Sequence, residues 1–62
     1  MKRAIYIGTT PLRRVGPRGS ELYLGYGMTG IAYPSGDNIR VFRSDDGADW
    51  YVEAKDLQFS RA

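Results

Sequence analysis

Residues 28–62, MTGIAYPSGDNIRVFRSDDGADWYVEAKDLQFSRA, decide the fold. Three short apolar runs in this stretch are separated by two polar turns, at residues 34–38 and 44–49. Runs this short, bounded by glycine, proline, asparagine and aspartate, are typical of β-strands and leave no room for a helical core. The stretch therefore predicts a small, strongly bent antiparallel β-barrel.

The amino-terminal half continues this pattern. Residues 4–7 and 22–24 predict further strands, because apolar side chains recur there with the period of two. Residues 12–20, with two glycines and a proline, predict a loop between them. The expected strands are 4–7, 22–24, 28–33, 39–43, 50–54 and 57–59, the second continuing into the third through a bend, with a short 3₁₀ turn near residues 54–56. We expect residues 1–62 to form one all-β domain, a five-stranded, antiparallel, partly open barrel.

Alternation along the strands also predicts which side chains are buried. Trp50 is the largest of them and is expected to anchor the core. Tyr6, Phe42 and Tyr51 fall on the second face, either as an exposed contact surface or as a satellite core under the 13–20 loop. The predicted core is Ile5, Ile7, Leu22, Leu24, Ile31, Ile39, Val41, Trp50, Val52 and Leu57.

Composition excludes several classes of function. The chain has no cysteine and no histidine, so disulfides, thiolate sites and the usual zinc sites are excluded. The longest apolar run is only a few residues, so we expect no membrane span, and no apolar stretch follows the basic residues 1–3 as in a secretory signal. The lack of cysteine fits a reducing compartment, and we expect a cytoplasmic protein.

Two motifs suggest chemistry that their context does not support. Residues 25–30 spell GxGxxG, but a dinucleotide site needs a long helix after the motif, and here a strand ends at Pro34. Asp45, Asp46 and Asp49 surround Gly47, which is hairpin-turn chemistry and lacks the closing glutamate of a calcium loop. No catalytic constellation is visible without histidine or cysteine. We therefore expect neither an enzyme nor a bound metal or cofactor.

Charge is distributed unevenly. Residues 1–20 carry five basic residues and no acid, whereas residues 21–62 carry four basic residues against seven acids. Arginines with tyrosines nearby are the residue types of protein hot spots, and they also grip phosphate and stack on bases. A solvated surface with no direct role is the third interpretation. The candidate partner-binding residues are Arg13, Arg14, Arg18, Tyr23 and Tyr26.

A family resemblance rests on the order of these segments. A glycine-led strand at 27–32, a strand at 39–42, the Asp-Asp-Gly turn before 50–52 and the Asp56-Leu57 step together resemble the Src-homology-3-like small barrels. In that comparison the 12–21 loop takes the place of the family's long first hairpin loop. The aromatic-rich opening and the closing proline-to-tyrosine signature of the peptide-binding members are absent, so the resemblance does not imply binding of proline-rich peptides.

Other members of this broad class suggest what such a barrel does. Related barrels in ribosomal and transcription-elongation proteins bind RNA or protein through the same loops. Small free-standing barrels also resemble accessory proteins of bacteria and their phages, some of which bind and inhibit a host factor. We therefore expect a non-enzymatic binding module that contacts and modulates a protein partner. The alternatives are a nucleic-acid-binding barrel that uses the same basic loop, and a structural subunit that associates through barrel edges. We expect a monomer, with homo-oligomers left open.

Overall fold

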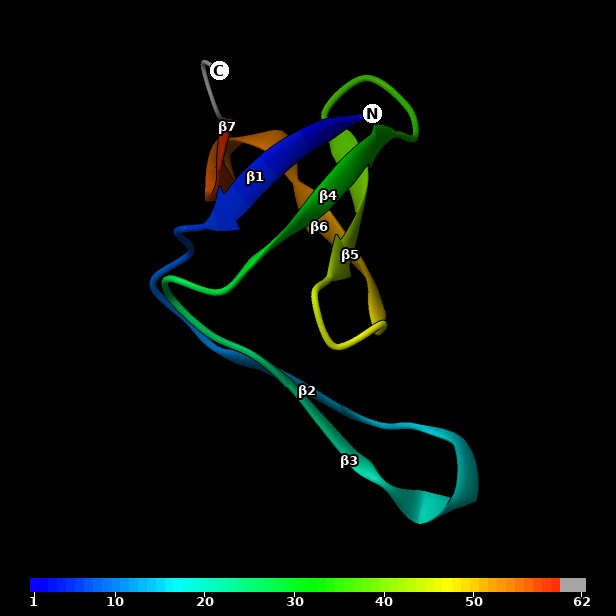
Figure 1. Ribbon diagram of the computed structural model, residues 1–62. Helices are drawn as coiled ribbons and strands as arrows, with labels where there is room; N and C mark the ends of the chain where they lie inside the picture. The colour runs from blue at the N-terminus through cyan, green and yellow to red at the C-terminus, as the bar shows by residue number, and fades with distance from the viewer. Residues whose placement is uncertain (60–62) are drawn as a thin grey trace.

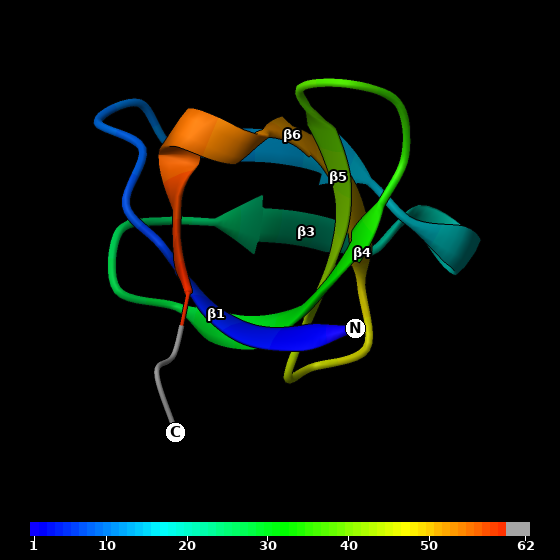
Figure 2. The same ribbon diagram turned by 90° about the horizontal axis from the view of Figure 1, so that it is seen from above.

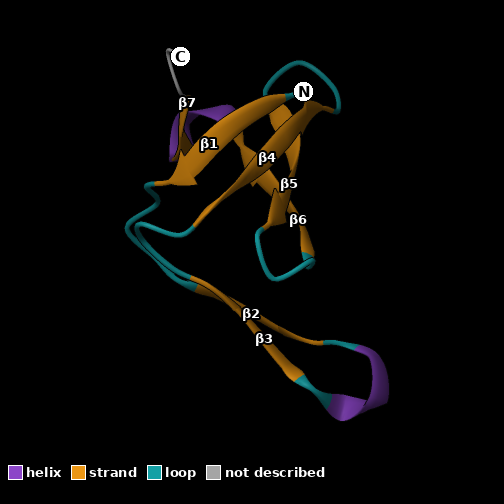
Figure 3. Ribbon diagram, in the orientation of Figure 1, coloured by secondary structure: helices purple, strands orange, loops and turns teal. Residues whose placement is uncertain are grey.

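The computed structural model describes residues 1–59, which form strands joined by turns and two single 3₁₀ turns (Figure 3). The predicted all-β class is confirmed, and so is the 3₁₀ turn at residues 54–56. No helix in this part of the chain is long and apolar enough to cross a membrane. The elements are β1 (Lys2–Tyr6), β2 (Leu12–Val15), η1 (Pro17–Gly19), β3 (Glu21–Leu24), β4 (Thr29–Pro34), β5 (Ile39–Ser44), β6 (Asp49–Glu53), η2 (Ala54–Asp56) and β7 (Leu57–Phe59).

Five of the strands form one antiparallel sheet in the order β6-β5-β4-β1-β7. The sheet is strongly curled into a half-barrel, and β3 crosses the opening of the curl (Figure 2). β2 and β3 pair only with each other, and this hairpin extends away from the barrel (Figure 1). The predicted bent, partly open arrangement is therefore confirmed.

The turn between β5 and β6 fixes the register of these two strands. Gly47 has a φ of +92°, and its N–H donates to the Ser44 carbonyl oxygen at 2.8 Å. The Ser44 N–H in turn donates to the Ala48 carbonyl oxygen at 2.9 Å. A turn with glycine at the left-handed position matches the twist of a hairpin. Its consequence is that Phe42 lies directly opposite Trp50.

The glycines of residues 25–30 shape the path of the chain between β3 and β4. Gly27 has a φ of +89°, and the Met28 N–H donates to the Gly25 carbonyl oxygen at 3.2 Å. Gly30 is buried in β4, where a Cβ atom would lie 2.8 Å from the Cα of Ser44 on β5. The motif therefore serves a tight turn and a close approach of two strands, as strand glycines often do.

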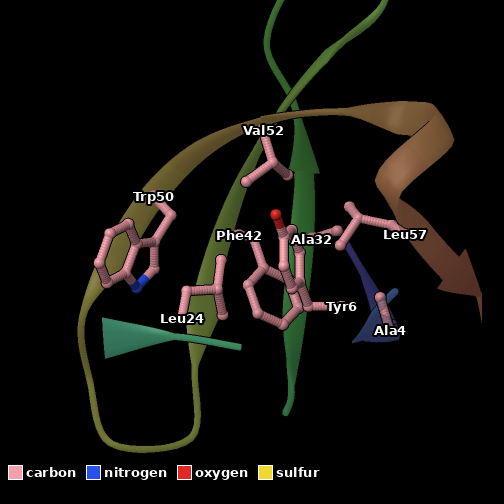
Figure 4. Packing of buried hydrophobic residues seen from close by; sticks show 8 residues of the cluster. All are labelled: Ala4, Tyr6, Leu24, Ala32, Phe42, Trp50, Val52 and Leu57. Carbon is pink, nitrogen blue, oxygen red and sulfur yellow. The ribbon is translucent and has the colours of Figure 1, made fainter. Parts of the chain in front are cut away.

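The core lies on the concave side of the half-barrel (Figure 4). Phe42 and Leu24 are fully buried at its centre. The Tyr6 ring is buried too, and its hydroxyl donates to the Thr10 carbonyl oxygen at 3.0 Å. Burial is the main reason that the pKa of this hydroxyl is raised above its ordinary value. The buried apolar residues are Ala4, Tyr6, Leu24, Ala32, Phe42, Trp50, Val52 and Leu57.

The predicted core is confirmed at Leu24, Trp50, Val52 and Leu57 and is wrong for the facing of β1, β4 and β5, since Ala32 and not Ile31 faces inward from β4. Ala4 and Tyr6, instead of the isoleucines, face inward from β1, and Phe42 faces inward from β5. Ile5 and Ile39 are exposed, whereas Ile7, Leu22, Ile31 and Val41 are only partly buried. The large rings fit the interior because small alanines lie beside them, Ala32 directly opposite Phe42.

The second-face prediction changes accordingly. Tyr6 and Phe42 are core residues, so they form neither an exposed aromatic cluster nor a satellite core, and Tyr51 alone of the three is exposed. The predicted loop at 12–20 is also wrong in part, because residues 12–15 form β2 and residues 17–19 form η1.

Candidate functional site

The five candidate residues lie on or beside the β2–β3 hairpin, and the pairing of the two strands decides where each one points. Leu12 lies opposite Leu24 and Arg14 opposite Leu22, whereas Arg13 lies opposite Tyr23. Because side chains alternate along a strand, these pairs occupy two different faces. The inner side of the hairpin packs its leucines against the barrel core, and the other side, called the solvent side of the hairpin, is turned toward solvent.

Arg13 and Tyr23 form a stacked pair on the solvent side of the hairpin. The Arg13 guanidinium carbon lies 5.2 Å from the centre of the Tyr23 ring, within the range of a cation–π contact. The ring lies over Gly25, where a side chain would collide with it. Tyr23 nevertheless remains 46% exposed, and its neighbour on this face, Val15, is 73% exposed. The pair is thus an ordered, half-exposed aromatic flanked by an exposed aliphatic side chain.

Arg14 is on the inner face and covers the core tryptophan. Its guanidinium carbon lies 4.9 Å from the centre of the Trp50 ring. Trp50 is buried, and its indole N–H finds no hydrogen-bond partner among the described residues. Arg14 therefore ties the hairpin to the barrel, so its side chain does not join Arg13 in a single surface.

Arg18 is at the tip of the hairpin. It has a φ of +62°, followed by Gly19 with a φ of +75°, and the Ser20 N–H donates to the Pro17 carbonyl oxygen at 3.3 Å. Positive φ at both central positions is the pattern of a type I′ hairpin turn. Among residues 1–59, Arg18 is the one non-glycine residue with a positive φ, and its side chain is exposed.

Tyr26 is apart from the other four residues. It stands in the turn between β3 and β4, at the end of the hairpin opposite to Arg18, and is 77% exposed. The structure thus brings together Arg13 and Tyr23, places Arg18 further along the same hairpin, and separates Arg14 and Tyr26 from them.

The hairpin arginines differ in their surroundings from the three cations that form ion pairs, and they resemble Lys2 and Arg40, which form none within residues 1–59. Arg3, Arg43 and Lys55 each form ion pairs with aspartate or glutamate. Within residues 1–59, Arg13, Arg14 and Arg18 take part in no ion pair. Their charge is therefore not neutralised locally and remains available to an acidic partner.

A cleft of about 520 Å³ lies between the hairpin and the β5–β6 turn. Arg14, Val15 and Pro17 line one wall, and Asp46 and Asp49 line the other. Arg14 is close enough to contribute to the lowered pKa of Asp49. Sequence reasoning missed this acidic wall because it assigned the aspartates to the turn alone, and no sequence signal placed that turn against the hairpin.

The acidic turn gives the protein a predictable response to acid. Hydrogen bonds lower the pKa of Asp45, Asp46 and Asp49 below the ordinary value of 3.8, and the chief donors are Thr29, Ser44 and Arg43 respectively. A carboxyl with a lowered pKa in the folded state contributes stability above its ordinary pKa and loses it as the pH falls through the lowered value.

We therefore expect the melting temperature to be flat from neutral pH down to about pH 5 and to fall below about pH 4, where these carboxylates become protonated. Thermal unfolding followed by circular dichroism at a series of pH values measures this. Asp49→Asn removes the charged partner of Arg43. It should lower the melting temperature at pH 7 and make the fall of the melting temperature below about pH 4 less steep. If the melting temperature of Asp49→Asn fell as steeply below about pH 4 as that of the wild type, the Asp49 carboxylate would not contribute to the loss of stability in acid.

Comparison with protein-family models, with curated proteins and with solved structures found no match to the chain. What the site does must therefore be argued from its own residues.

Proposed function

We propose that the protein is a non-enzymatic binding module that contacts another protein through the β2–β3 hairpin. The observation that carries this proposal is the Arg13–Tyr23 stack, which presents an ordered aromatic ring beside exposed Val15. Tyrosine and arginine dominate the energetics of protein interfaces, and a ring already fixed in place loses little entropy on binding. The unpaired charge of Arg13 and Arg18 would add electrostatic steering toward an acidic patch.

We also infer that the half-barrel is of Src-homology-3-like type. The order of elements supports this: a long hairpin after the first strand, then two short hairpins, a 3₁₀ turn and a last strand that pairs with the first. Fold alone does not imply a function, so the proposal rests on the hairpin surface and not on the class of barrel.

Nucleic-acid binding by the same hairpin is the second candidate, favoured by the three unpaired arginines. Two observations weigh against it. One face of the Tyr23 ring is already occupied by Arg13, which leaves less of the ring for a base. Glu21 lies opposite Val15 on the solvent side of the hairpin, so an acid lies within the basic surface.

A pull-down from a bacterial lysate with the tagged protein, with and without nuclease, tests the proposal. We expect one dominant protein to be retained after nuclease treatment and to be identified by mass spectrometry. Tyr23→Ala should reduce its recovery about tenfold, the effect of losing a hot-spot side chain. Tyr23→Phe keeps the ring and Arg3→Ala removes a cation outside the hairpin, so both should bind as the wild type does.

Two results would contradict the proposal. Loss of all bound protein on nuclease treatment, with nucleic acid recovered in the untreated sample, would favour the second candidate. Its affinity for an oligonucleotide should then fall steeply with salt. Equal recovery with Tyr23→Ala and Tyr23→Phe would show that the hairpin ring is not the anchor.

A further inference from the structure

The convex side of the sheet carries an apolar surface that neither the core nor the hairpin uses. Tyr33, Val41 and Tyr51 lie directly beside one another across β4, β5 and β6. Isoleucines from β4 and β5 flank this row, and Tyr51 is 76% exposed. We call this surface the outer face, and its residues are Ile31, Tyr33, Ile39, Val41, Arg43, Asp49, Tyr51 and Glu53.

The outer face is distinct from the proposed binding hairpin. The leucines of β2 and β3 pack against the core, so the hairpin lies on the concave side of the curled sheet (Figure 2). The row of Tyr33, Val41 and Tyr51 points away from that core. One surface can therefore be covered while the other remains free.

Every charged side chain on the outer face is already paired. Arg43 donates to Asp49 through two nitrogens, at 2.7 and 3.2 Å, and Glu53 lies 3.2 Å from Lys55. The row of Tyr33, Val41 and Tyr51 between these ion pairs carries no charge, so aromatic and aliphatic side chains form the centre of the face. Such a surface offers nothing to a phosphate backbone or to a strongly charged protein.

An uncharged centre is the property that a self-associating face needs. In a two-fold symmetric dimer the same patch meets itself, so a net charge on it would repel its own copy. The hairpin, with its unpaired arginines, would repel itself in this way. The centre of the outer face would not, because its row of Tyr33, Val41 and Tyr51 is uncharged and Arg43 and Asp49 beside it cancel within each copy.

The size of the domain also favours a second copy. A chain of this length buries only about 60% of its unfolded surface, and small domains make up the deficit with disulfides, bound metals, very regular packing or oligomers. The sequence has no cysteine, so disulfides are not an option. Burying the outer face against its copy would add apolar contact where the single chain leaves it in water.

We propose that the outer face is a homodimer interface centred on the row of Tyr33, Val41 and Tyr51. A standard interface buries about 800 Å² of each partner, and the whole described chain exposes 4538 Å². The outer face spans three strands of five or six residues, which is only part of that surface, so we expect a weak dimer that forms at high protein concentration.

Sedimentation equilibrium over about 10 µM to about 1 mM protein, the range of weak interfaces, tests the proposal. The wild-type mass should rise from 7.0 kDa toward twice that value. Tyr51→Arg should weaken association at least about tenfold, since it places an unpaired charge in the interface. Tyr26→Arg is the matched control, because Tyr26 is 77% exposed, almost the same as Tyr51, but is outside the outer face. It should leave the association unchanged.

A second measurement separates a lost interface from a damaged fold. The wild-type melting temperature should rise with protein concentration, because dimerisation stabilises the folded chain. The melting temperature of Tyr51→Arg should stay constant while its circular dichroism spectrum remains that of the wild type. A wild-type mass of 7.0 kDa throughout the range would overturn the proposal. So would an undiminished dimer in Tyr51→Arg, which would place the contact at a strand edge instead.

Discussion

Gly30→Ala is expected to leave the chain largely unfolded at 25 °C. The new methyl group would point at the carbonyl oxygen of Arg43 and would come 2.8 Å from the Cα of Ser44. Both are backbone atoms of β5, so no side chain can rotate away to make room. Gly30 also pairs with Ala4 on its other side, and separating β4 from β5 would strain both pairings.

The expected size of this effect follows from the small total stability of the domain. A chain of this length has a free energy of unfolding of roughly 3–9 kcal/mol. Overpacking typically costs about 1–3 kcal/mol and occasionally more, and here only backbone atoms could move, so we expect a cost above that range that reaches the total stability. Circular dichroism and an amide NMR spectrum would show the loss of native signals.

Gly47→Ala is the control for this prediction. Gly47 has a φ of +92°, and open space surrounds the position of a Cβ atom, so alanine there meets only backbone strain of about 1 kcal/mol. We expect this variant to fold and to melt at a lower temperature than the wild type. A cooperative, wild-type-like melt of Gly30→Ala would show that β4 and β5 do not approach so closely.

Phe42→Ala should cost about 3–5 kcal/mol, because it removes a fully buried ring and leaves a cavity. Phe42 lies between Ala32 and Trp50 in adjacent strands, and neither the small alanine nor the tryptophan, held under Arg14, can fill the space. Urea unfolding monitored by tryptophan fluorescence measures the loss as a lower midpoint.

Tyr26→Ala serves as the control for Phe42→Ala, since it removes an exposed ring from a turn. We expect it to change the free energy of unfolding by no more than about 0.5 kcal/mol. Similar losses for the two variants would mean that Phe42 is not at the centre of the core. If Ile39→Ala lowered the free energy of unfolding more than Phe42→Ala, Ile39 and not Phe42 would face the core, as the sequence predicted.

The facing of β5 shows where sequence patterns reach their limit. Both faces of this strand contain apolar side chains, Ile39 and Val41 on one and Phe42 on the other, so alternation alone does not choose between them. The buried face of β5 can nevertheless be deduced from the neighbouring turn. The turn centred on Gly47 sets Phe42 opposite Trp50, and the burial of Trp50 was predicted correctly. Turn geometry therefore carries information that hydrophobicity counts miss.

The hairpin was missed for a different reason. Residues 12–15 hold two arginines and isolated apolar side chains, and Gly16 and Pro17 follow at once, so the local pattern indicates a loop. Its pairing partner, β3, and the packing of its leucines on the barrel are what make it a strand. Such support from distant residues is not visible in a short window of sequence.

The sequence predicts the candidate site only as a set of arginines and tyrosines. The structure shows where each of them lies and which of them are in contact. Arg13 and Tyr23 meet because they are cross-strand neighbours, a relation that exists only once β2 pairs with β3. Arg14, next to Arg13 in sequence, points the opposite way and covers Trp50. Adjacent arginines that look equivalent in the sequence therefore have separate roles, one in a surface and one in holding the hairpin.

The pairing of β1 with β7 has a consequence for how the chain reaches its native state. Ala4 lies opposite Phe59, so residues from nearly opposite ends of the described chain must meet before the sheet is complete. Closing so long a loop costs entropy before any contact compensates for it, and small barrels rich in such pairings fold in about milliseconds to seconds. During synthesis β1 leaves the ribosome before β7 and stays without this partner until β7 emerges. The half-barrel thus closes only after its last strand has been made.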